Sequence, residues 1–284
     1  MELCNEIVIR GLLERHGFRF SRSMGQNFLI DPSIPAAIAE ASGADEGCGV
    51  LEIGPGIGPL TAERAKRAGK VVSIELDRAL LPVLAETVGD LPNVEIVPGD
   101  ALRLDLERLI AEKFQGLTPM VCANLPYNIT TPVLTKLAGI PSLTALTVLI
   151  QKEAAQRFTA PQGSPEIGAF PLQLQYRMET ALLFAVEPEC FLPRPKVTST
   201  VLHCVRRQQP AVAVRDAALL QKVLKGAFLL RRKTLRNRRA SALPQFSKEE
   251  IQAAIAECGL PATVRGEALG LAEFAALTEA LAKG

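Results

Sequence analysis

The stretch Glu52-Ile53-Gly54-Pro55-Gly56-Ile57-Gly58 decides the fold, because a glycine-rich loop here joins a short apolar strand to a helix. We expect the strand at residues 50–53 and the helix at 60–68, with Gly69 ending the helix. Glycine permits the tight turn and lets a ligand approach the backbone at the carboxyl end of the strand. Glycines at such a turn are also often structural, so the motif alone leaves both interpretations open.

The spacing of the glycines argues against a dinucleotide. A dinucleotide fingerprint reads G-x-G-x-x-G, whereas this loop reads G-x-G-x-G and contains Pro55, which removes one backbone donor. Glu52 would repel a pyrophosphate, but it suits the cationic methionine end of S-adenosylmethionine. A nucleotide-dependent dehydrogenase is therefore the disfavoured alternative.

Strands and helices alternate after this motif. Further strands are expected at 70–76, 94–97, 119–123 and 143–150, and helices at 34–41, 78–88, 101–114 and 151–158. This alternation predicts βαβ units and a mostly parallel sheet that is covered on both faces. Strand candidates at 178–186 and 197–205 leave no room for a helix between them, which predicts an antiparallel pair at a sheet edge.

The last part of the chain has a different pattern. From about residue 212 it is expected to be helical, at 216–230, 233–241, 248–258 and 271–282. We therefore predict an α/β catalytic domain with an N-terminal arm at residues 1–210. A small all-helical domain is predicted at 211–284.

Composition excludes several classes of protein. A chain of 284 residues with 48% hydrophobic content can form a core without disulfides or metal. The six cysteines are scattered and neither histidine stands at ligand spacing from one, so we expect no metal site. We find no signal peptide and no apolar run of about 18 residues, which predicts a cytoplasmic protein with no membrane span. A monomer is the default expectation.

The net charge of +2 is unevenly distributed. Residues 1–210 carry 20 basic and 23 acidic side chains, whereas residues 211–284 carry 12 and 7. Between Lys222 and Arg239 lie eight basic residues and no acidic one. This concentration favours binding of a polyanion such as nucleic acid, with a solvated helix face as the simpler interpretation. The predicted RNA-binding residues are Arg231, Arg232, Lys233, Arg236, Arg238 and Arg239.

Polar residues stand at the carboxyl ends of successive expected strands. Glu75 ends the second strand, where a carboxylate can accept both ribose hydroxyl hydrogen bonds. Asp100 follows the third, placed to accept from an adenine amine, and Asn124 follows the fourth. Capping of helices is the alternative role for Glu75 and Asp100. As a set, these residues predict one S-adenosylmethionine site at a single edge of the sheet.

Asn124-Leu125-Pro126-Tyr127 is the predicted site of methyl transfer to a planar amine. The lone pair of such an amine is delocalised, and hydrogen bonds from the amine to the Asn124 side chain and a backbone carbonyl would aim it at the methyl group. Pro126 stiffens the turn and biases Leu125 toward an extended conformation. Tyr127 can stack on the base and face the sulfonium, an interaction of about 0.5–2 kcal/mol. The Pro-rich loop at 191–197 begins with Phe191, which would cover the other face of a flipped base or serve only as a buried anchor.

Together these residues resemble the ribosomal RNA adenine dimethyltransferase family. The matching stretches are residues 25–29, 52–58, 75–77, 99–101, 124–129, 151–153, 191–197 and 231–235. The resemblance implies a seven-stranded, Rossmann-like methyltransferase sheet that uses S-adenosylmethionine, plus a small C-terminal helical domain. It also implies dimethylation of the N6 amines of two adjacent adenosines near the 3′ end of small-subunit (16S) ribosomal RNA. The implied substrate is this RNA within a pre-assembled small ribosomal subunit, during ribosome biogenesis.

The motifs read above and the resemblance together assign roles to residues. Those expected to bind the cofactor are Asn27, Leu29, Glu52, Gly54, Gly56, Glu75, Asp100, Ala101 and Asn124. The expected catalytic residues are Asn124, Leu125, Pro126, Tyr127 and Phe191. Two alternatives stay open: a large-subunit ribosomal RNA adenine N6-methyltransferase of the antibiotic-resistance type, and a catalytically silent ribosome-assembly factor.

Overall fold

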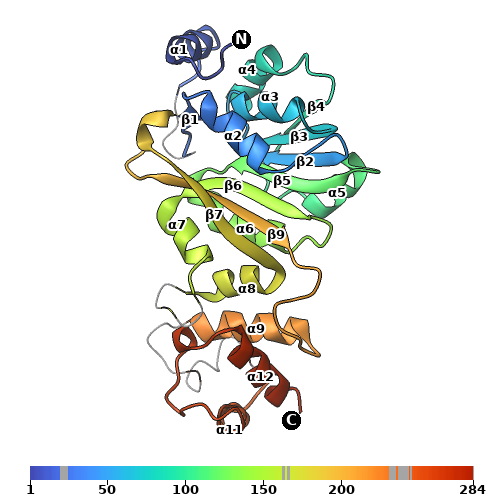
Figure 1. Cartoon of the computed structure of the whole chain (residues 1–284), viewed down its shortest axis with the longest axis vertical. Helices are drawn as coiled ribbons and strands as arrows, with labels where there is room; N and C mark the ends of the chain where they lie inside the picture. Colours follow the sequence, from blue (N-terminus) through green and yellow to red (C-terminus); the bar gives the residue numbers. More distant parts are fainter. Residues whose placement is uncertain are drawn as a thin grey trace. The chain divides into compact units, whose positions relative to one another are not determined.

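The chain forms two compact units (Figure 1). The computed structural model describes residues 1–19, 25–161, 164, 167–229, 235, 243 and 245–283. The first unit comprises Met1–Ala155 and Ala181–Arg206, and the second comprises Gln156–Thr180 and Arg207–Gly284. The division after Arg206 lies close to the predicted boundary at 210. The segment 156–180 groups with the C-terminal helices instead of the sheet, because its side chains pack into their core.

A central sheet organises the first unit (Figure 1). Its strand order is β4-β3-β2-β5-β6-β9-β7, with β2 Cys48–Ile53, β3 Lys70–Glu75, β4 Val94–Pro98, β5 Thr118–Asn124, β6 Ala145–Gln151, β7 Met178–Val186 and β9 Ser199–Arg206. The pairs from β4 to β6 are parallel, and β6 pairs antiparallel with β9. The mostly parallel seven-stranded sheet is therefore confirmed, and the last two predicted strands are neighbours at its edge.

Helices of the first unit follow the expected pattern, with changes at their ends. Their bounds are α1 Glu6–Arg15, α2 Ser33–Ala41, α3 Pro59–Ala65, α4 Leu81–Thr87, α5 Leu106–Lys113 and α6 Thr130–Ala138, and α7 follows β6 at Lys152–Phe158. The single helix expected at 78–88 is divided into a 3-10 turn, Arg78–Leu80, and α4. The reason is Pro82, which has no N–H to donate to the Arg78 carbonyl.

The prediction of a helix from Ala101 is wrong. α5 begins only at Leu106, where the Asp105 side chain accepts from the Arg108 N–H. Residues 101–104 form a turn instead, because the Lys136 ammonium binds carbonyl oxygens that an earlier helix start would use.

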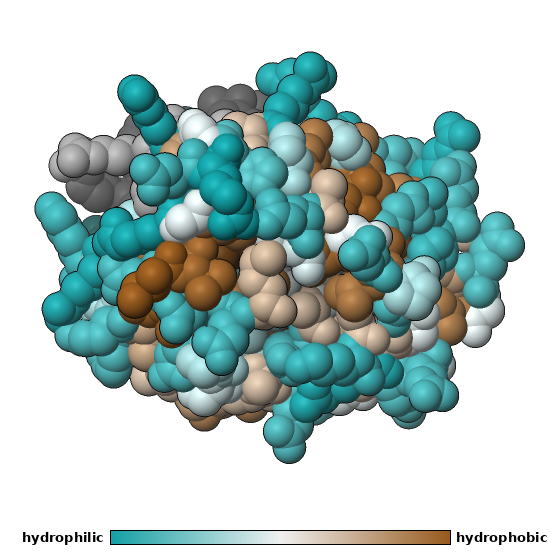
Figure 2. Space-filling model, turned by 90° about the horizontal axis from the view of Figure 1, so that it is seen from above, coloured by the Kyte–Doolittle hydropathy of each residue, from teal (hydrophilic) through white to brown (hydrophobic). Residues whose placement is uncertain are grey.

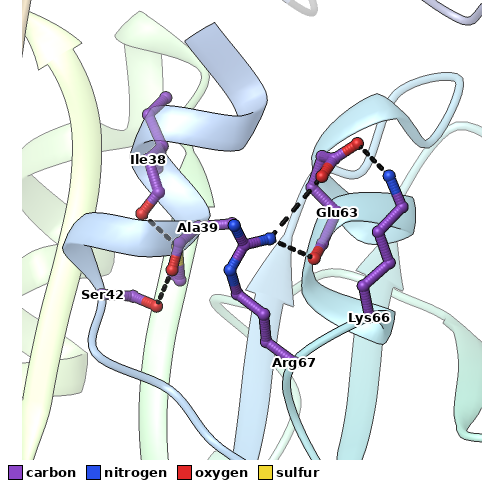
Figure 3. A network of polar contacts seen from close by, with 7 residues as sticks. Ile38, Ala39, Ser42, Glu63, Lys66 and Arg67 are labelled. Atoms are coloured by element: carbon purple, nitrogen blue, oxygen red, sulfur yellow. Dashed lines mark hydrogen bonds and ion pairs between the residues drawn. The ribbon is translucent and has the colours of Figure 1, made fainter. Parts of the chain in front are cut away.

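Helices α2 and α3 lie side by side against one face of the sheet. They bury apolar side chains together with residues that alternate along the strands, including Leu29, Ile38, Val50, Leu60 and Cys122. Figure 3 shows their polar margins: Ser42 donates to the Ala39 carbonyl at the end of α2, and on α3 Glu63 pairs with Lys66 and Arg67. On the opposite face Gly49 meets the ring of Phe114 so closely that a Cβ atom would lie 2.4 Å from it.

The N-terminal arm is attached to the first unit by a second, two-stranded sheet. β1 Phe28–Leu29 pairs antiparallel with β8 Phe191–Leu192. The backbone N–H of Ile30 extends this pairing by donating to the Cys190 carbonyl at 2.8 Å. Strands of two residues carry almost no periodic signal, and the sequence analysis did not predict them.

The second unit is helical. Its helices are α8 Ala169–Arg177, α9 Ala217–Phe228, α11 Lys248–Glu257 and α12 Leu271–Leu281, and they share one apolar core. Asp216 caps α9, and α11 begins with a capping box formed by Ser247 and Glu250. Except for Leu235, the predicted helix at 233–241 lies outside the described residues, and α8 was not predicted.

Exposed apolar residues are dispersed. On the face seen in Figure 2, separate hydrophobic patches interrupt a mostly hydrophilic surface. Among the described large apolar side chains of the first unit, the most exposed are Ile7, Met1 and Leu76, at 83%, 68% and 51%. No helix in the described ranges is long and apolar enough to cross a membrane.

A buried ion pair joins β2 to α3 directly beneath the glycine loop. The Arg64 Nη1 atom lies 3.0 Å from Glu52 Oε1, and both side chains are almost fully buried. The hydroxyls of Thr61 and Ser73 donate to Glu52 Oε2 at 2.6 and 2.7 Å. These contacts fix the loop ends from below.

Removing one partner of this pair leaves an uncompensated buried charge. We expect Arg64→Met to lower the free energy of unfolding by about 3–5 kcal/mol. The double variant Glu52→Gln/Arg64→Met should lose much less, because no charge is then buried. Urea denaturation checks both variants, and a double variant as unstable as Arg64→Met would contradict this account.

Candidate active site

The hydrogen-bond ladder of the parallel strands continues one residue beyond the strand ends. The N–H of Gly54 donates to Ile74 at 2.9 Å, and the N–H of Gly99 donates to Glu75 at 2.8 Å. The N–H of Leu125 donates to Leu149 at 3.1 Å in the same way. The loops after β2, β4 and β5 therefore leave the sheet in register and meet at one edge.

A cavity of about 1010 Å³, which includes space open to solvent, lies at this edge. Its walls come from the arm and from the loops after four strands: residues 25–29, 52–56, 59–60, 74–76, 80, 99–101 and 124–129. Every predicted cofactor-binding residue is among them, and so are four of the five predicted catalytic residues.

The glycine loop takes a conformation that needs glycine. Gly54, Gly56 and Gly58 all have positive φ, at 71°, 62° and 92°. A Cβ atom on Gly56 would lie 3.1 Å from the ring of Phe28, so the arm packs directly on the loop. At Gly54 and Gly56 the loop thus presents its backbone alone to the cavity, and Pro55 lines the cavity between them.

The contacts of Glu52 give it a structural role inside the protein. It contributes to the cavity wall, but its two carboxylate oxygens bind Arg64, Thr61 and Ser73. Since the carboxylate is 1% exposed and already ion-paired, the structure does not present it as a free partner for a cationic ligand. The physical reason is that a buried carboxylate is stabilised by the nearest cation, here Arg64.

Glu75 is a buried carboxylate at the end of β3. It is 6% exposed, and its burial raises its pKa to about 7, although backbone N–H groups, including that of Asp77 at 2.7 Å, partly offset the shift. Glu75 does not cap a helix, because Asp77 caps the following turn instead. Its carboxylate is therefore a hydrogen-bonding group of the cavity wall.

Asp100 also does not cap the next helix, since Asp105 does so. The Asp100 Oδ1 atom accepts from the Leu102 N–H at 2.9 Å, and Oδ2 lies 3.4 Å from Nε of the exposed Arg103. Ala101, next in sequence, is 5% exposed and closes the cavity behind it. Asp100 and Ala101 together form the part of the cavity wall that follows β4.

The side chain of Asn124 is oriented by the arm. Its Nδ2 group donates to the backbone carbonyl of Asn27 at 3.3 Å. With the amide nitrogen used in this way, Oδ1 is the acceptor on the cavity side. Asn27 in turn donates to the Gly25 carbonyl at 3.1 Å, which fixes the arm segment itself.

The two carbonyls that follow Asn124 have different environments. The Pro126 carbonyl accepts from the Ile129 N–H and the Thr130 hydroxyl, both at 3.2 Å. The carbonyl of Leu125 accepts no hydrogen bond from any residue in the described part of the chain. It therefore remains available as an acceptor in the residue that follows Asn124.

Tyr127 is held by its hydroxyl group. The hydroxyl forms a 2.7 Å hydrogen bond with the hydroxyl of Ser199, which is fully buried on β9. Burial raises the pKa of Tyr127, so it remains a neutral phenol. Sequence reasoning missed Ser199, which stands 72 residues away and at no recognisable spacing.

Phe191 is the one predicted catalytic residue that the structure does not bring into the cavity wall. It is 2% exposed, pairs with Leu29 across β1 and β8, and belongs to the apolar cluster behind them. Leu29 lines the cavity in front of it. In this arrangement Phe191 supports the wall, and its stacking on a base stays a prediction.

Other predictions are only partly covered by the described residues. The six basic residues predicted to bind RNA, from Arg231 to Arg239, lie outside them. In the part that the structure describes, no group of His, Cys, Asp and Glu side chains is arranged to hold a metal ion. Two polar contacts that the sequence did not suggest also shape the cavity: Gln26 donates to Asp77 at 2.8 Å, and Lys136 binds the turn after Asp100.

Comparison with known proteins identifies relatives over the whole chain. The family model for ribosomal RNA adenine dimethylase matches residues 17–283. The ribosomal RNA small subunit methyltransferase A of Streptococcus gordonii is 44% identical, over 99% of this chain and 98% of its own length. The protein of the same name from a Geobacillus species is 41% identical, over 96% and 95%.

Solved structures agree with the fold. A dimethyladenosine transferase from Plasmodium falciparum superposes with a TM-score of 0.71 at 22% identity, covering 88% of this chain and 95% of its own. The 23S rRNA methyltransferase ErmE gives a TM-score of 0.64 at 25% identity, covering 90% and 99%.

The raised pKa of Glu75 makes stability depend on pH. The folded protein retains this proton up to about pH 7, whereas the unfolded chain loses it near the ordinary value of 4.5. Stability is therefore lost as the pH rises between these values, by about 3 kcal/mol at most. We expect Glu75→Gln to be as stable as the parent near pH 4.5 and more stable at pH 8.

Urea denaturation across this pH range, without ligand, measures the difference. Glu249→Gln, which neutralises an exposed carboxylate at the start of α11, is the control. If the difference in the free energy of unfolding between Glu75→Gln and the parent is constant from pH 4.5 to 8, the raised pKa of Glu75 is refuted.

Proposed function

Because the chain belongs to the ribosomal RNA adenine dimethylase family, we propose that it dimethylates the N6 amines of two adjacent adenosines near the 3′ end of small-subunit (16S) ribosomal RNA, using S-adenosylmethionine, in ribosome biogenesis. The observation that carries the chemistry is the pair of acceptors, Asn124 Oδ1 and the Leu125 carbonyl, at the edge of the cavity. An N6 amine has two N–H bonds, which match these two acceptors.

The residues of the cavity fit S-adenosylmethionine. Glu75 offers a buried carboxylate to the ribose hydroxyls, and Asp100 stands beside it for the adenine amine. The side-chain-free loop at Gly54 and Gly56 leaves room for the methionine part. The cationic ammonium group would then bind backbone carbonyls and polar groups of the arm, since Glu52 is committed to Arg64.

The site prepares the amine for attack. When bound, S-adenosylmethionine supplies an electrophilic methyl group on a positively charged sulfur. Asn124 and Leu125 hold the two N–H bonds, so the nitrogen lone pair is turned away from conjugation and toward the cofactor side of the cavity. Tyr127, fixed by Ser199, offers its ring face to the base and to positive charge. After methylation the amine is acidic and its proton passes to water.

The same two acceptors serve the second transfer. One N–H remains after the first methylation, and a single acceptor is enough to orient it.

The alternatives are less well supported. Relatives at 44% and 41% identity carry small-subunit names, whereas the large-subunit enzyme ErmE is 25% identical. A silent assembly factor would have no need to retain Glu75, Asp100, Asn124 and Tyr127 around one cavity. We propose that the substrate is a partly assembled small subunit and that the enzyme acts as a monomer.

Methyl transfer from labelled cofactor to immature small subunits tests this function. We expect dimethyladenosine at two adjacent positions near the RNA 3′ end, located by primer extension. Asn124→Ala should lower the rate about 10²–10³-fold, because one preorganised acceptor is lost. Asn5→Ala, which removes an asparagine at the start of α1, is the matched control and should retain the parent rate.

Two outcomes count against the proposal. Modification of large-subunit RNA alone would favour the antibiotic-resistance type. Complete absence of transfer by the parent protein, with intact binding to small subunits, would favour an assembly factor.

The basic segment between Lys222 and Arg239 leads to a separate prediction about RNA binding. Replacing Arg231, Arg232 and Lys233 by Gln should weaken RNA binding and reduce the slope of log K against log salt by about 2–3, because each phosphate contact contributes about 0.7–0.9. The control replaces Arg10, Lys66 and Arg108, which pair with carboxylates of their own helices. Equal slopes for the parent and the first variant would exclude backbone contacts by this segment.

A further inference from the structure

Lys136 makes an unusual set of contacts near the end of α6. Its ammonium group donates to the backbone carbonyls of Ala101, Leu102 and Leu104, at 3.0, 2.9 and 2.5 Å. An ammonium has three protons, so these bonds use all of its donors. All three acceptors lie in one turn, between β4 and α5.

These contacts decide the conformation of that turn. In a helix starting at Ala101, the same carbonyls would accept from the N–H groups of Asp105, Leu106 and Arg108. Lys136 takes the carbonyls instead, and the Arg108 N–H bonds to the Asp105 side chain. The chain therefore turns back after Asp100, with N–H groups of Arg103 and Leu104 both donating to the Asp100 carbonyl at 2.9 Å.

The turn at residues 101–104 fixes the position of the Asp100 side chain. The Leu102 carbonyl is held by Lys136, and the Leu102 N–H donates to Asp100 Oδ1 at 2.9 Å. Leu104 packs on Gly99, where a Cβ atom would lie 2.9 Å from its Cδ1. The other neighbour of the carboxylate, Arg103, is 89% exposed and 3.4 Å away, so it holds Asp100 weakly.

We propose that Lys136 is a positioning residue that sets the base selectivity of the cofactor site by holding Asp100 and Ala101 in the cavity wall. The inference rests on the proposed cofactor site. Asp100 accepts from an adenine 6-amino group but repels the 6-oxo group of hypoxanthine, and this discrimination requires a fixed carboxylate. α6 starts directly after Asn124–Tyr127, so one helix supports both the base wall and the methyl-transfer motif.

The test compares two ligands, S-adenosylhomocysteine and S-inosylhomocysteine, by calorimetry. The parent should bind the adenine compound far more tightly. Lys136→Met should weaken that binding about tenfold and change binding of the hypoxanthine compound much less, so the selectivity ratio falls. kcat at saturating cofactor should fall less than about threefold, because the amine acceptors are untouched.

Two further variants separate positioning from general destabilisation. Lys113→Met removes a lysine at the end of α5 that pairs with Glu95, and should leave the ratio unchanged. In an Asp100→Asn background, Lys136→Met should add little to the loss of selectivity, because both act through one carboxylate.

The outcomes are distinct. Equal weakening of both ligands by Lys136→Met, or an additive effect with Asp100→Asn, would overturn the role of Lys136. A parent protein that binds neither ligand would overturn the proposed cofactor site itself.

Discussion

The parallel hydrogen-bond ladder is the constraint on which the site depends. Because it continues past the strands through Gly54, Gly99 and Leu125, the loops after β2, β4 and β5 start from fixed positions. Because the loops start side by side, the side chains at these positions line one cavity. The Glu52–Arg64 pair joins the end of β2 to α3 and so links the two elements that flank the glycine loop.

Long-range polar contacts then orient the groups that the sheet has brought together. Asn27 determines which atom of Asn124 accepts, Ser199 holds the ring of Tyr127, and Lys136 holds the turn after Asp100. Each contact joins segments that are at least 30 residues apart in sequence. The cavity is therefore an assembly of short segments, each fixed by a side chain from elsewhere in the first unit.

The sequence predicted the parallel strands well, because buried parallel strands are near-continuous apolar runs, and here Gly54 and Glu75 mark the ends of two of them. It failed where tertiary contacts compete with local preference. Ala101–Leu104 has an ordinary helical composition, yet Lys136 binds its carbonyls and delays α5 to Leu106. Leu29 and Phe191 form a sheet of two short strands that no local pattern signals.

The sequence by itself determined the α/β class, the glycine loop and the polar residues at the strand ends, because these follow from local periodicity and turn chemistry. Only the tertiary structure decided what each polar group does. It placed Glu52 in a buried ion pair, left Glu75 as a hydrogen-bonding carboxylate of the cavity wall, and put Phe191 behind Leu29. The physical reason is that burial and pairing depend on neighbours distant in sequence, whose identity local spacing does not contain.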